Sequence, residues 1–323
     1  MPVKLTLVRA SCVFMLLAAA GAPAQDYPTR PVRVLVPYTP GGITDLVTRI
    51  AAAELAKALN QTFVVDNRPG ANSILAVDMV SKATPDGYTL GTVIAAHAAN
   101  QTLYAKLPYD SVKSFEHVSL LVTSPLIVCV PNSLPAKSIN ELIELAKAKP
   151  GTLSFASSGI GAAAHLTTEL LMSTTGIKMV HVPYKGTAPA LQDLIGGQIN
   201  FMMDTPMPAM LPQARAGKVR AIGMASDKRI SIAQDVPTLI EQGVQVTGGT
   251  WVAMLAPAHT PRAIVDKLSK AVGEAMRRPD NRERFAQLGM EPVGSTSPEL
   301  TAFLKGEVAK WAKVIKDANV KID

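Results

Sequence analysis

Short apolar runs rich in β-branched residues alternate with longer segments of helical spacing along this chain, and this alternation restricts its possible folds more than any other feature. The first apolar run is Val32–Val36, which ends at a turn of proline and glycine residues, 37–42. The segment 45–59 then carries apolar side chains at helical intervals. Repeated strand–helix units of this kind predict an α/β fold whose strands are mainly parallel.

The strand–helix units fall into two similar groups. The first has predicted strands at 32–36, 62–65 and 88–95 and predicted helices at 45–59 and 73–83. The second has predicted strands at 153–156, 178–182, 199–203 and 221–225 and predicted helices at 139–147, 162–174 and 188–195. Two apolar strands bordered by proline, 125–131 and 251–257, lead from one group to the other, and a helical tail follows Pro261.

These groups predict a molecule of two lobes with a ligand cleft between them. Because the chain is expected to cross near residues 127 and 250, we assign 25–127 and 249–323 to one discontinuous domain and 128–248 to a second domain. Ligands of open α/β sheets bind at the carboxyl ends of strands, where strand turns into helix. The candidate site is therefore expected among the turns that face the cleft.

Residues 1–24 have the pattern of a secretory signal peptide. Lys4 and Arg9 give a positive start, 13–20 is an apolar run, and the segment 22–24, Ala-Pro-Ala, is a small-x-small cleavage site. The alternative is a membrane anchor, but the uncharged run at 10–24 is shorter than the roughly 20 residues that span a bilayer. The mature protein is therefore expected to be exported.

The composition excludes several classes of protein. The chain is 48% apolar and 18% charged, which is typical of a globular protein with a large core. Its formal charge of +7 falls to +5 without residues 1–24, and the remaining Lys and Arg do not cluster, so no nucleic-acid partner is expected. Cys12 would be removed with that segment. Cys129 would then be the one remaining cysteine, so neither an internal disulfide nor a metal or other cofactor is expected.

The turn at 39–45, Thr-Pro-Gly-Gly-Ile-Thr-Asp, begins the first predicted helix. Gly41 and Gly42 allow backbone N–H groups to approach a ligand closely, and a helix N-terminus carries about half a positive charge. Such a turn binds a carboxylate or phosphate without needing Lys or Arg. The structural alternative is that Thr44 or Asp45 caps the helix and that the glycines only turn the chain.

A second turn of the same build, Ser-Ser-Gly-Ile-Gly at 157–161, precedes the predicted helix at 162–174. Its two hydroxyl groups are additional hydrogen-bond donors. Gly159, Gly161 and Ala164 also match the dinucleotide pattern G-x-G-x-x-A. The following strand, however, does not end in an Asp or Glu that would hold a ribose. We therefore expect this turn to bind an anion rather than a dinucleotide.

Further candidate ligand-binding groups lie in the second lobe. His165 shares a helix face with Glu169, and it is either a buried structural histidine or a hydrogen-bond donor into the cleft; a metal site would need more ligands than these. Tyr184 and Lys185 follow the next predicted strand and offer a phenol and an ammonium group, although Lys185 can equally be a solvated surface charge. Asp204 ends the strand after that, where it can hold a ligand group or cap a loop.

A catalytic function is the main alternative to binding. Ser157 and Ser158 are the candidate nucleophiles of an exported α/β hydrolase or transferase, but they precede Gly159 as a pair and do not form G-x-S-x-G. Either serine would need a base within hydrogen-bond reach. Cys129 lies in an apolar strand, where a thiol is expected to be inert packing. The sequence therefore favours a receptor over an enzyme.

Seven motifs in order give almost the whole mature chain a family resemblance. They are Tyr-Pro-x-Arg-Pro-Val-Arg (27–33), Pro-Gly-Gly-x-x-Asp (40–45), Asn-Arg-Pro-Gly-Ala (67–71), Pro-Asp-Gly-Tyr-Thr-Leu (85–90), Leu-Tyr-x-Lys-Leu-Pro-Tyr-Asp (103–110), Val-Pro-Tyr-Lys-Gly (182–186) and Asp-Val-Pro-Thr (235–238). With these motifs the chain resembles the solute receptors of tripartite tricarboxylate transporters, the Bug family.

This resemblance implies a two-lobed type II periplasmic binding-protein fold that closes on a small carboxylate. In that family the two turns hold the carboxylate through backbone amides and ordered waters. The matching positions here are Gly41, Gly42, Asp45, Ser157, Ser158, Gly161 and His165, with Tyr184 and Asp204 near the cleft. The resemblance further implies a periplasmic receptor, expected to be a monomer without a cofactor, whose partner is a membrane permease or a sensor domain.

The chain departs from the family pattern in one segment. The family commonly continues Gly-Ala-Gly-Gly-Asn-Ile-Gly after Arg-Pro, whereas residues 70–76 read Gly-Ala-Asn-Ser-Ile-Leu-Ala. The bulkier side chains, Asn72 among them, are expected to reshape the first-lobe wall, which leaves dicarboxylates, amino acids and aromatic acids open as ligands. Residues His97–Asn100 are also expected to face the cleft. A gene-regulatory sensor of the same fold is a further alternative, which the signal peptide disfavours.

Overall fold

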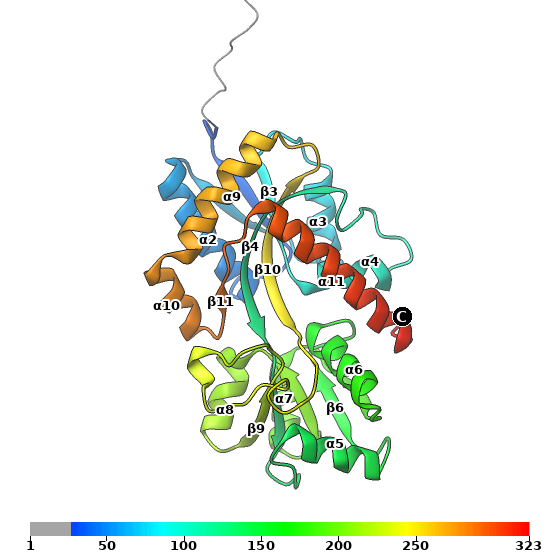
Figure 1. Ribbon diagram of the computed structural model, residues 1–323. Helices are drawn as coiled ribbons and strands as arrows, with labels where there is room; N and C mark the ends of the chain where they lie inside the picture. The colour runs from blue at the N-terminus through cyan, green and yellow to red at the C-terminus, as the bar shows by residue number, and fades with distance from the viewer. Residues whose placement is uncertain (1–26, 323) are drawn as a thin grey trace, which may run out of the picture.

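The computed structural model describes residues 27–322, so the predicted signal peptide at 1–24 lies outside the described residues. The chain forms two lobes of mixed α/β structure, each built around its own sheet (Figure 1). In Figure 1, β4 (Phe115–Pro125) runs from the upper lobe towards the lower one, and β10 (Gly249–Pro257), antiparallel to it, runs back. No helix between residues 27 and 322 is both long and apolar enough to span a bilayer.

The first lobe contains a six-stranded sheet in the order β11-β4-β10-β3-β1-β2. Its other strands are β1 (Val32–Val36), β2 (Phe63–Asn67), β3 (Thr89–Val93) and β11 (Glu291–Pro292). Its helices are α2 (Ile43–Leu59), η1 (Ala71–Ser73), α3 (Ile74–Ser81), α4 (Ala95–Leu103), α9 (Arg262–Arg277), α10 (Pro279–Gln287) and α11 (Ser297–Asp317). Apolar residues of α2 and α9 pack on one face of the sheet and those of α3, α4 and α11 on the other.

The second lobe contains a five-stranded sheet in the order β7-β6-β8-β5-β9. Its strands are β5 (Ile127–Pro131), β6 (Ser154–Ser157), β7 (Val180–Pro183), β8 (Phe201–Asp204) and β9 (Val219–Met224). Its helices are α5 (Ile139–Ala148), α6 (Ala163–Thr175), α7 (Thr187–Ile195), η2 (Pro206–Met210), α8 (Leu211–Arg215) and η3 (Ser231–Ala233). One apolar cluster lies against α5 and α6, and another lies against α7 and α8.

The expectation of mainly parallel strands is wrong. In the first sheet β1 pairs in parallel with β2 and β3, but β10 is antiparallel to β3 and β4, and β11 is antiparallel to β4. In the second sheet β6 is parallel to β7 and β8, but β5 is antiparallel to β8 and β9. The antiparallel pairs arise because the strands that carry the chain between the lobes run against their neighbours.

Two elements beside these crossings were not predicted from the sequence. Strand β4 contains buried polar residues that interrupt its apolar pattern: Ser119 Oγ donates to the Ser295 carbonyl oxygen at 2.7 Å, and Ser124 Oγ donates to the Gly289 carbonyl oxygen at 3.0 Å. Helix α4 begins at Ala95, which the sequence assigned to the end of a strand. Contacts with segments distant in the sequence stabilise both elements, because β4 pairs with β10 and apolar residues of α4 pack with those of α11. Such contacts leave no periodic signal in the sequence.

Candidate functional site

The strand ends that carry the two predicted turns point towards each other across the gap between the lobes. In the first lobe the chain crosses where Gly249 pairs with Pro125, so β10 begins next to the second lobe. Strand β3 is antiparallel to β10 and therefore ends next to the second lobe, as do β1 and β2, which run parallel to β3. In the second lobe, Ile127 pairs with Asp204 and Met224 at the crossing, so β8 ends next to the first lobe. Strands β6 and β7 run parallel to β8 and end there as well. The turns after β1 and β6 therefore open towards the same gap.

Four helices begin at this gap without a side-chain cap. The N-cap residues of α2, α4, α6 and α7 are Gly42, Ile94, Ala162 and Gly186, and none of these residues accepts a side-chain hydrogen bond from its helix. Away from the gap, α5 and α11 have a side-chain cap and α9 and α10 lack one, so the gap is distinguished by the meeting of four uncapped helix starts. Because each helix start carries about half a positive charge and uncapped N–H groups, the gap is suited to an anion.

Asp45 organises the first-lobe turn from inside. It is 4% exposed, and its carboxylate accepts hydrogen bonds from the Gly41 N–H at 3.0 Å, Arg49 Nε at 3.0 Å and Asn67 Nδ2 at 2.9 Å. Burial acts to raise the pKa of Asp45, but the hydrogen bonds from Arg49, Gly41 and Asn67 outweigh it and lower that pKa. Gly41 and Gly42 are exposed, and Gly41 has a φ of 88°, which glycine adopts without strain. Asp45 thus positions a turn whose open side consists of glycine backbone.

Two stacked histidines support the second-lobe turn. Ser157 Oγ lies 2.7 Å from His181 Nε2 and 3.0 Å from the Gly159 carbonyl oxygen, and the Gly161 N–H donates to His165 Nδ1 at 3.1 Å. The rings of His165 and His181 stack with their centroids 3.9 Å apart. Burial, followed by the proximity of His165, lowers the pKa of His181 to about 4. Ser157 and His165 are both buried, so they hold the turn from inside.

The remaining predicted residues of the second lobe also have partners within the protein. Tyr184 Oη donates to Asp193 Oδ2 at 2.6 Å, and burial followed by this carboxylate raises the pKa of Tyr184 to about 12. Asp204 is buried and accepts hydrogen bonds from Thr187 Oγ1 at 2.6 Å and from the Thr205 N–H at 2.7 Å. Burial outweighs these bonds and raises the pKa of Asp204. Among residues 27–322 no three His, Cys, Asp or Glu side chains gather as a metal site requires.

The segment that departs from the family pattern has an unusual backbone. Ala71, Asn72 and Ser73 all have positive φ angles, of 46°, 48° and 76°. Asn72 Nδ2 donates to Asn100 Oδ1 at 2.9 Å, and Asn100 Nδ2 donates back to the Asn72 carbonyl oxygen at 2.9 Å. Consecutive left-handed residues other than glycine are strained, and this reciprocal pair holds them in place. The sequence indicated a bulkier wall here, but it gave no sign that Asn72 and Asn100 would meet.

The expectation that His97 faces the cleft is wrong. His97 is fully buried, and its Nε2 donates to the Ser111 carbonyl oxygen at 2.8 Å. Its ring stacks on Tyr109 and meets Phe115 edge-on. Desolvation by burial lowers the pKa of His97 to about 4. His97 is a core residue because the first turn of α4 directs its side chains into the apolar cluster that α4 shares with α11. A strand at this position would have directed them differently.

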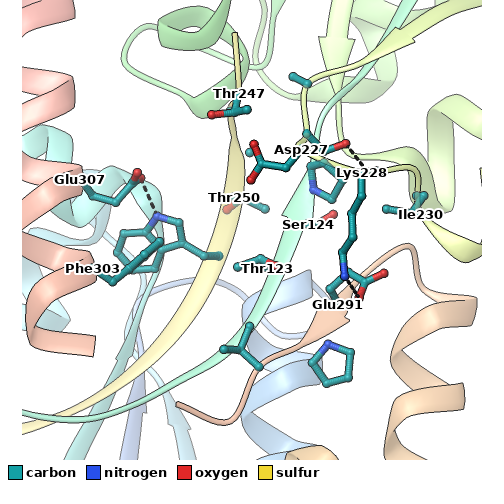
Figure 2. A pocket seen from close by; sticks show the side chains of 18 of the residues that line it. Thr123, Ser124, Asp227, Lys228, Ile230, Thr247, Thr250, Glu291, Phe303 and Glu307 are labelled. Atoms are coloured by element: carbon teal, nitrogen blue, oxygen red, sulfur yellow. Dashed lines mark hydrogen bonds and ion pairs between the residues drawn. The ribbon is translucent and has the colours of Figure 1, made fainter. Parts of the chain in front are cut away.

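A cavity of about 750 Å³ lies beside the crossing strands (Figure 2). It is lined by the ends of β4 and β10, the loop after β9, β11 and residues of α11. In the sheet orders, β11 and β9 lie at the opposite end from β1, β2, β6 and β7, and the two turns follow β1 and β6. We call this cavity the hinge cavity. Lys228 Nζ of the second lobe and Glu291 Oε2 of the first lie 3.8 Å apart across it. Trp251 Nε1 in its wall donates to Glu307 Oε2 at 2.9 Å. No sequence motif pointed to this cavity.

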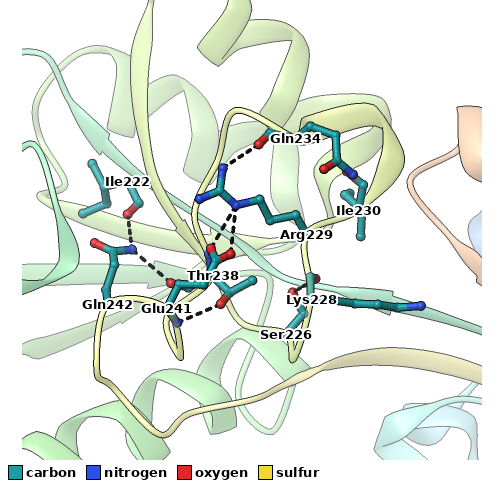
Figure 3. A network of polar contacts seen from close by, with 9 residues as sticks. All are labelled: Ile222, Ser226, Lys228, Arg229, Ile230, Gln234, Thr238, Glu241 and Gln242. Carbon is teal, nitrogen blue, oxygen red and sulfur yellow. Dashed lines mark hydrogen bonds and ion pairs between the residues drawn. The ribbon is translucent and has the colours of Figure 1, made fainter.

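The second-lobe wall of the hinge cavity is braced by a polar network (Figure 3). Arg229 Nε donates to both carboxylate oxygens of Glu241, at 3.1 and 2.9 Å, and Arg229 Nη1 donates to the Gln234 carbonyl oxygen at 2.7 Å. Glu241 also accepts the Thr238 N–H at 2.7 Å. These bonds fix the loop that follows β9 and contains the Asp-Val-Pro-Thr motif. That motif therefore supports the loop and lies away from the two turns.

Comparison with known proteins identifies the family to which the chain is similar. The family model described as "Tripartite tricarboxylate transporter family receptor" matches residues 47–320. The chain is 35% identical to Protein BugT of Bordetella pertussis over 315 residues, which cover 96% of both chains. It is 36% identical to a UPF0065 protein of Agrobacterium vitis over 325 residues, covering 98% of this chain and 94% of the relative.

Solved structures are similar over the same length. The periplasmic binding protein BugD superposes with a TM-score of 0.75 at 37% identity, covering 91% of this chain and 99% of that one. A protein of R. palustris with adipate gives 0.79 at 34% identity, covering 91% and 99%. MatC of Rhodopseudomonas palustris, with bound malate, gives 0.74 at 34% identity, covering 90% and 100%.

Proposed function

Because this chain belongs to the family of tripartite tricarboxylate transporter receptors, we propose that it is a periplasmic receptor that captures one small carboxylate between its lobes. The observation that carries this proposal is the convergence of uncapped helix starts from both lobes on one gap. A ligand held by both lobes stabilises a closed form through contacts that neither lobe offers alone. Charge-assisted hydrogen bonds from backbone N–H groups replace the water shell of the carboxylate.

The ligand-binding positions proposed on this basis are the glycine turn of the first lobe, with Gly41 and Gly42, and the turn with Ser158 and Gly161 in the second lobe. Asp45, Ser157 and His165 serve as positioning residues that hold these turns. Similar proteins contain adipate or malate, which supports a dicarboxylate, with amino acids and aromatic acids as further candidates. The loaded receptor would deliver its ligand to a membrane permease or signal to a sensor domain. No step of this function needs catalysis.

A thermal-shift panel tests the proposal. The purified mature chain is heated with mono- and dicarboxylates, and we expect at least one to raise the melting temperature, since a ligand that binds only the folded state stabilises it. Native mass spectrometry of the protein as purified then identifies any retained ligand. The absence of a shift with every anion would count against a carboxylate receptor.

One observation favours the catalytic alternative: Ser157 Oγ and His181 Nε2 are 2.7 Å apart, the distance of a nucleophile and its base. Ser157 is fully buried, however, and its single hydroxyl proton is shared with the Gly159 carbonyl oxygen at 3.0 Å. We therefore expect no turnover of activated esters that depends on Ser157. Comparing the wild-type chain with Ser157→Ala checks this, because ester hydrolysis abolished by the substitution would establish an enzyme.

A further inference from the structure

Four large apolar side chains are strongly exposed among residues 27–322, and two of them border the gap. Their exposed fractions are 48% for Val64, 50% for Leu75, 39% for Ile160 and 52% for Val180. Val64 and Val180 belong to β2 and β7, which are the outer strands of their sheets. Leu75 and Ile160 instead lie at the turns after β2 and β6, one in each lobe. Exposure at a sheet edge is ordinary, whereas exposed apolar side chains on both lobes at the turns that border a gap are placed to form a contact on closure.

Both side chains lie beside the same contact between the lobes. Leu75 is the second residue of α3 and packs over Gly70, where a Cβ would be 3.3 Å from Leu75 Cδ2. The η1 segment beside it is bonded to Asn100, one turn before Leu103. A Cβ on Gly161 would lie 2.7 Å from Leu103 Cδ1, so this leucine touches the second-lobe turn next to Ile160.

Beside these turns the ammonium group of Lys185 is exposed, and among residues 27–322 it has no ion pair, so it is available to a carboxylate of the ligand. Other charged groups nearby are bonded within the protein. Arg68 Nε is paired with Asp66 Oδ1 at 3.0 Å, and Asp204 is buried with its carboxylate bonded to neighbouring groups. The helix starts can hold a carboxylate through backbone N–H groups, but the side chains of Leu75 and Ile160 offer no hydrogen bond to the rest of a ligand. A hydroxyl group placed against them would lose its water without a new partner.

We propose that Leu75 and Ile160 close over the body of the ligand and that the receptor selects carboxylates with an unsubstituted alkyl or aryl body over hydroxylated ones. This inference rests on the proposed function. It names the class within the carboxylates: straight-chain or aromatic acids, with one or two carboxylate groups, in preference to hydroxy acids of the same length and charge.

Isothermal titration calorimetry with matched pairs of acids tests the selection. Adipate is compared with its tetrahydroxy analogue galactarate, and hexanoate with gluconate. We expect the unsubstituted acid of at least one pair to bind about tenfold or more tightly than its partner, because the apolar body is removed from water. Equal or tighter binding of the hydroxylated acids overturns the selection and leaves the receptor function intact. Failure of all carboxylates to bind overturns the proposed function itself.

Variants with matched controls test the two residues. Leu75→Gln and Ile160→Thr should each weaken binding of the unsubstituted acid about five- to tenfold and leave the hydroxylated acid unaffected. Val64→Thr and Val180→Thr change equally exposed residues at the sheet edges and should leave both affinities unchanged. Leu75→Ala, which keeps an apolar helix residue, repeats the test if Leu75→Gln does not fold. Wild-type affinity in the Leu75 and Ile160 variants, or equal losses in the controls, overturns the assignment.

Discussion

At the scale of single residues, most polar side chains at the two turns already have protein partners. Asp45 binds the Gly41 N–H, His165 accepts the Gly161 N–H, and Tyr184 donates to Asp193. Such groups cannot also hold a ligand without breaking these bonds. Asp45 and His165 also occupy the Gly41 and Gly161 N–H groups, so the donors left for a carboxylate are the N–H groups that follow them at the starts of α2 and α6. The side chains around these N–H groups fix where they point.

Asp45→Asn tests this positioning role. The amide would bring an N–H group towards donors on Arg49 and Asn67, so we expect the free energy of unfolding to fall by about 1–3 kcal/mol and carboxylate affinity to fall as the turn loosens. Chemical denaturation and calorimetry measure the two effects. Asp266→Asn, which alters an exposed ion pair with Arg262 on α9, should cost about 1 kcal/mol or less and leave affinity unchanged. Wild-type affinity in Asp45→Asn would refute the role of Asp45.

The buried histidine His97 predicts how stability depends on pH. Its pKa is about 4 in the folded protein and about 6.5 when unfolded, so the unfolded state binds more protons between these values. The free energy of unfolding should therefore fall as pH is lowered from about 6.5 to about 4, by up to roughly 1.4 kcal/mol per pH unit from this residue. Urea denaturation at a series of pH values should show a smaller slope for His97→Gln than for the wild-type chain. Identical slopes would contradict the buried neutral histidine.

At the scale of elements, the start of α6 joins the second-lobe turn to the first lobe. Gly161 has a φ of 77°, and the place of its missing Cβ is only 2.7 Å from Leu103 Cδ1 of α4. A side chain at this position would therefore destabilise the protein in two ways: it would strain the left-handed backbone, and it would collide with Leu103 of the other lobe. A side chain at Gly151 would cause only the backbone strain, because the φ of Gly151 is 74° and nothing lies within 4 Å of its Cβ position.

Gly161→Ala and Gly151→Ala together separate these costs. Both should lower the free energy of unfolding by about 1–2 kcal/mol through the left-handed backbone. Only Gly161→Ala should weaken carboxylate binding, because its methyl group pushes the turn away from Leu103, and adding Leu103→Ala should restore part of the affinity. Equal affinities in the two single variants would show that the contact between Gly161 and Leu103 is unimportant for binding.

Elements with a local signal could be predicted, and those decided by distant contacts could not. Strand β1 was predicted with its observed bounds, and α2 within two residues, because both have clear apolar periodicity and a glycine turn between them. Strand β4 was missed because buried serines bonded to Ser295 and Gly289 interrupt its pattern. The two turns were likewise visible as motifs, whereas the pairs Asn72–Asn100 and Ser157–His181 join residues that no sequence spacing connects.

For the molecule as a whole, the sheet orders place the two turns and the hinge cavity on opposite sides of the crossing strands. A rotation about these strands that brings the turns together must widen the hinge cavity, and a rotation that separates the turns must narrow it. A bulky group in the hinge cavity that resists its narrowing should therefore favour the closed form. Population shifts of this kind change affinity without any contact with the ligand.

Thr247→Trp, which adds bulk in the hinge cavity, should raise carboxylate affinity about three- to tenfold and make the ligand-free protein more compact. Calorimetry and small-angle X-ray scattering measure these changes. Thr152→Trp places the same side chain on an exposed threonine two residues before β6, at the end of the strand remote from the gap, and should change neither quantity. Reduced affinity in Thr247→Trp would show instead that the hinge cavity narrows when the two turns come together.

The most direct test of the account is a crystal structure of the mature protein with a carboxylate that calorimetry shows to bind. We expect the carboxylate between the turn at Gly41–Gly42 and the turn at Ser158–Gly161, with its oxygens within hydrogen-bond distance of backbone N–H groups from both lobes. A carboxylate bound in the hinge cavity, or one that contacts a single lobe, would contradict the account.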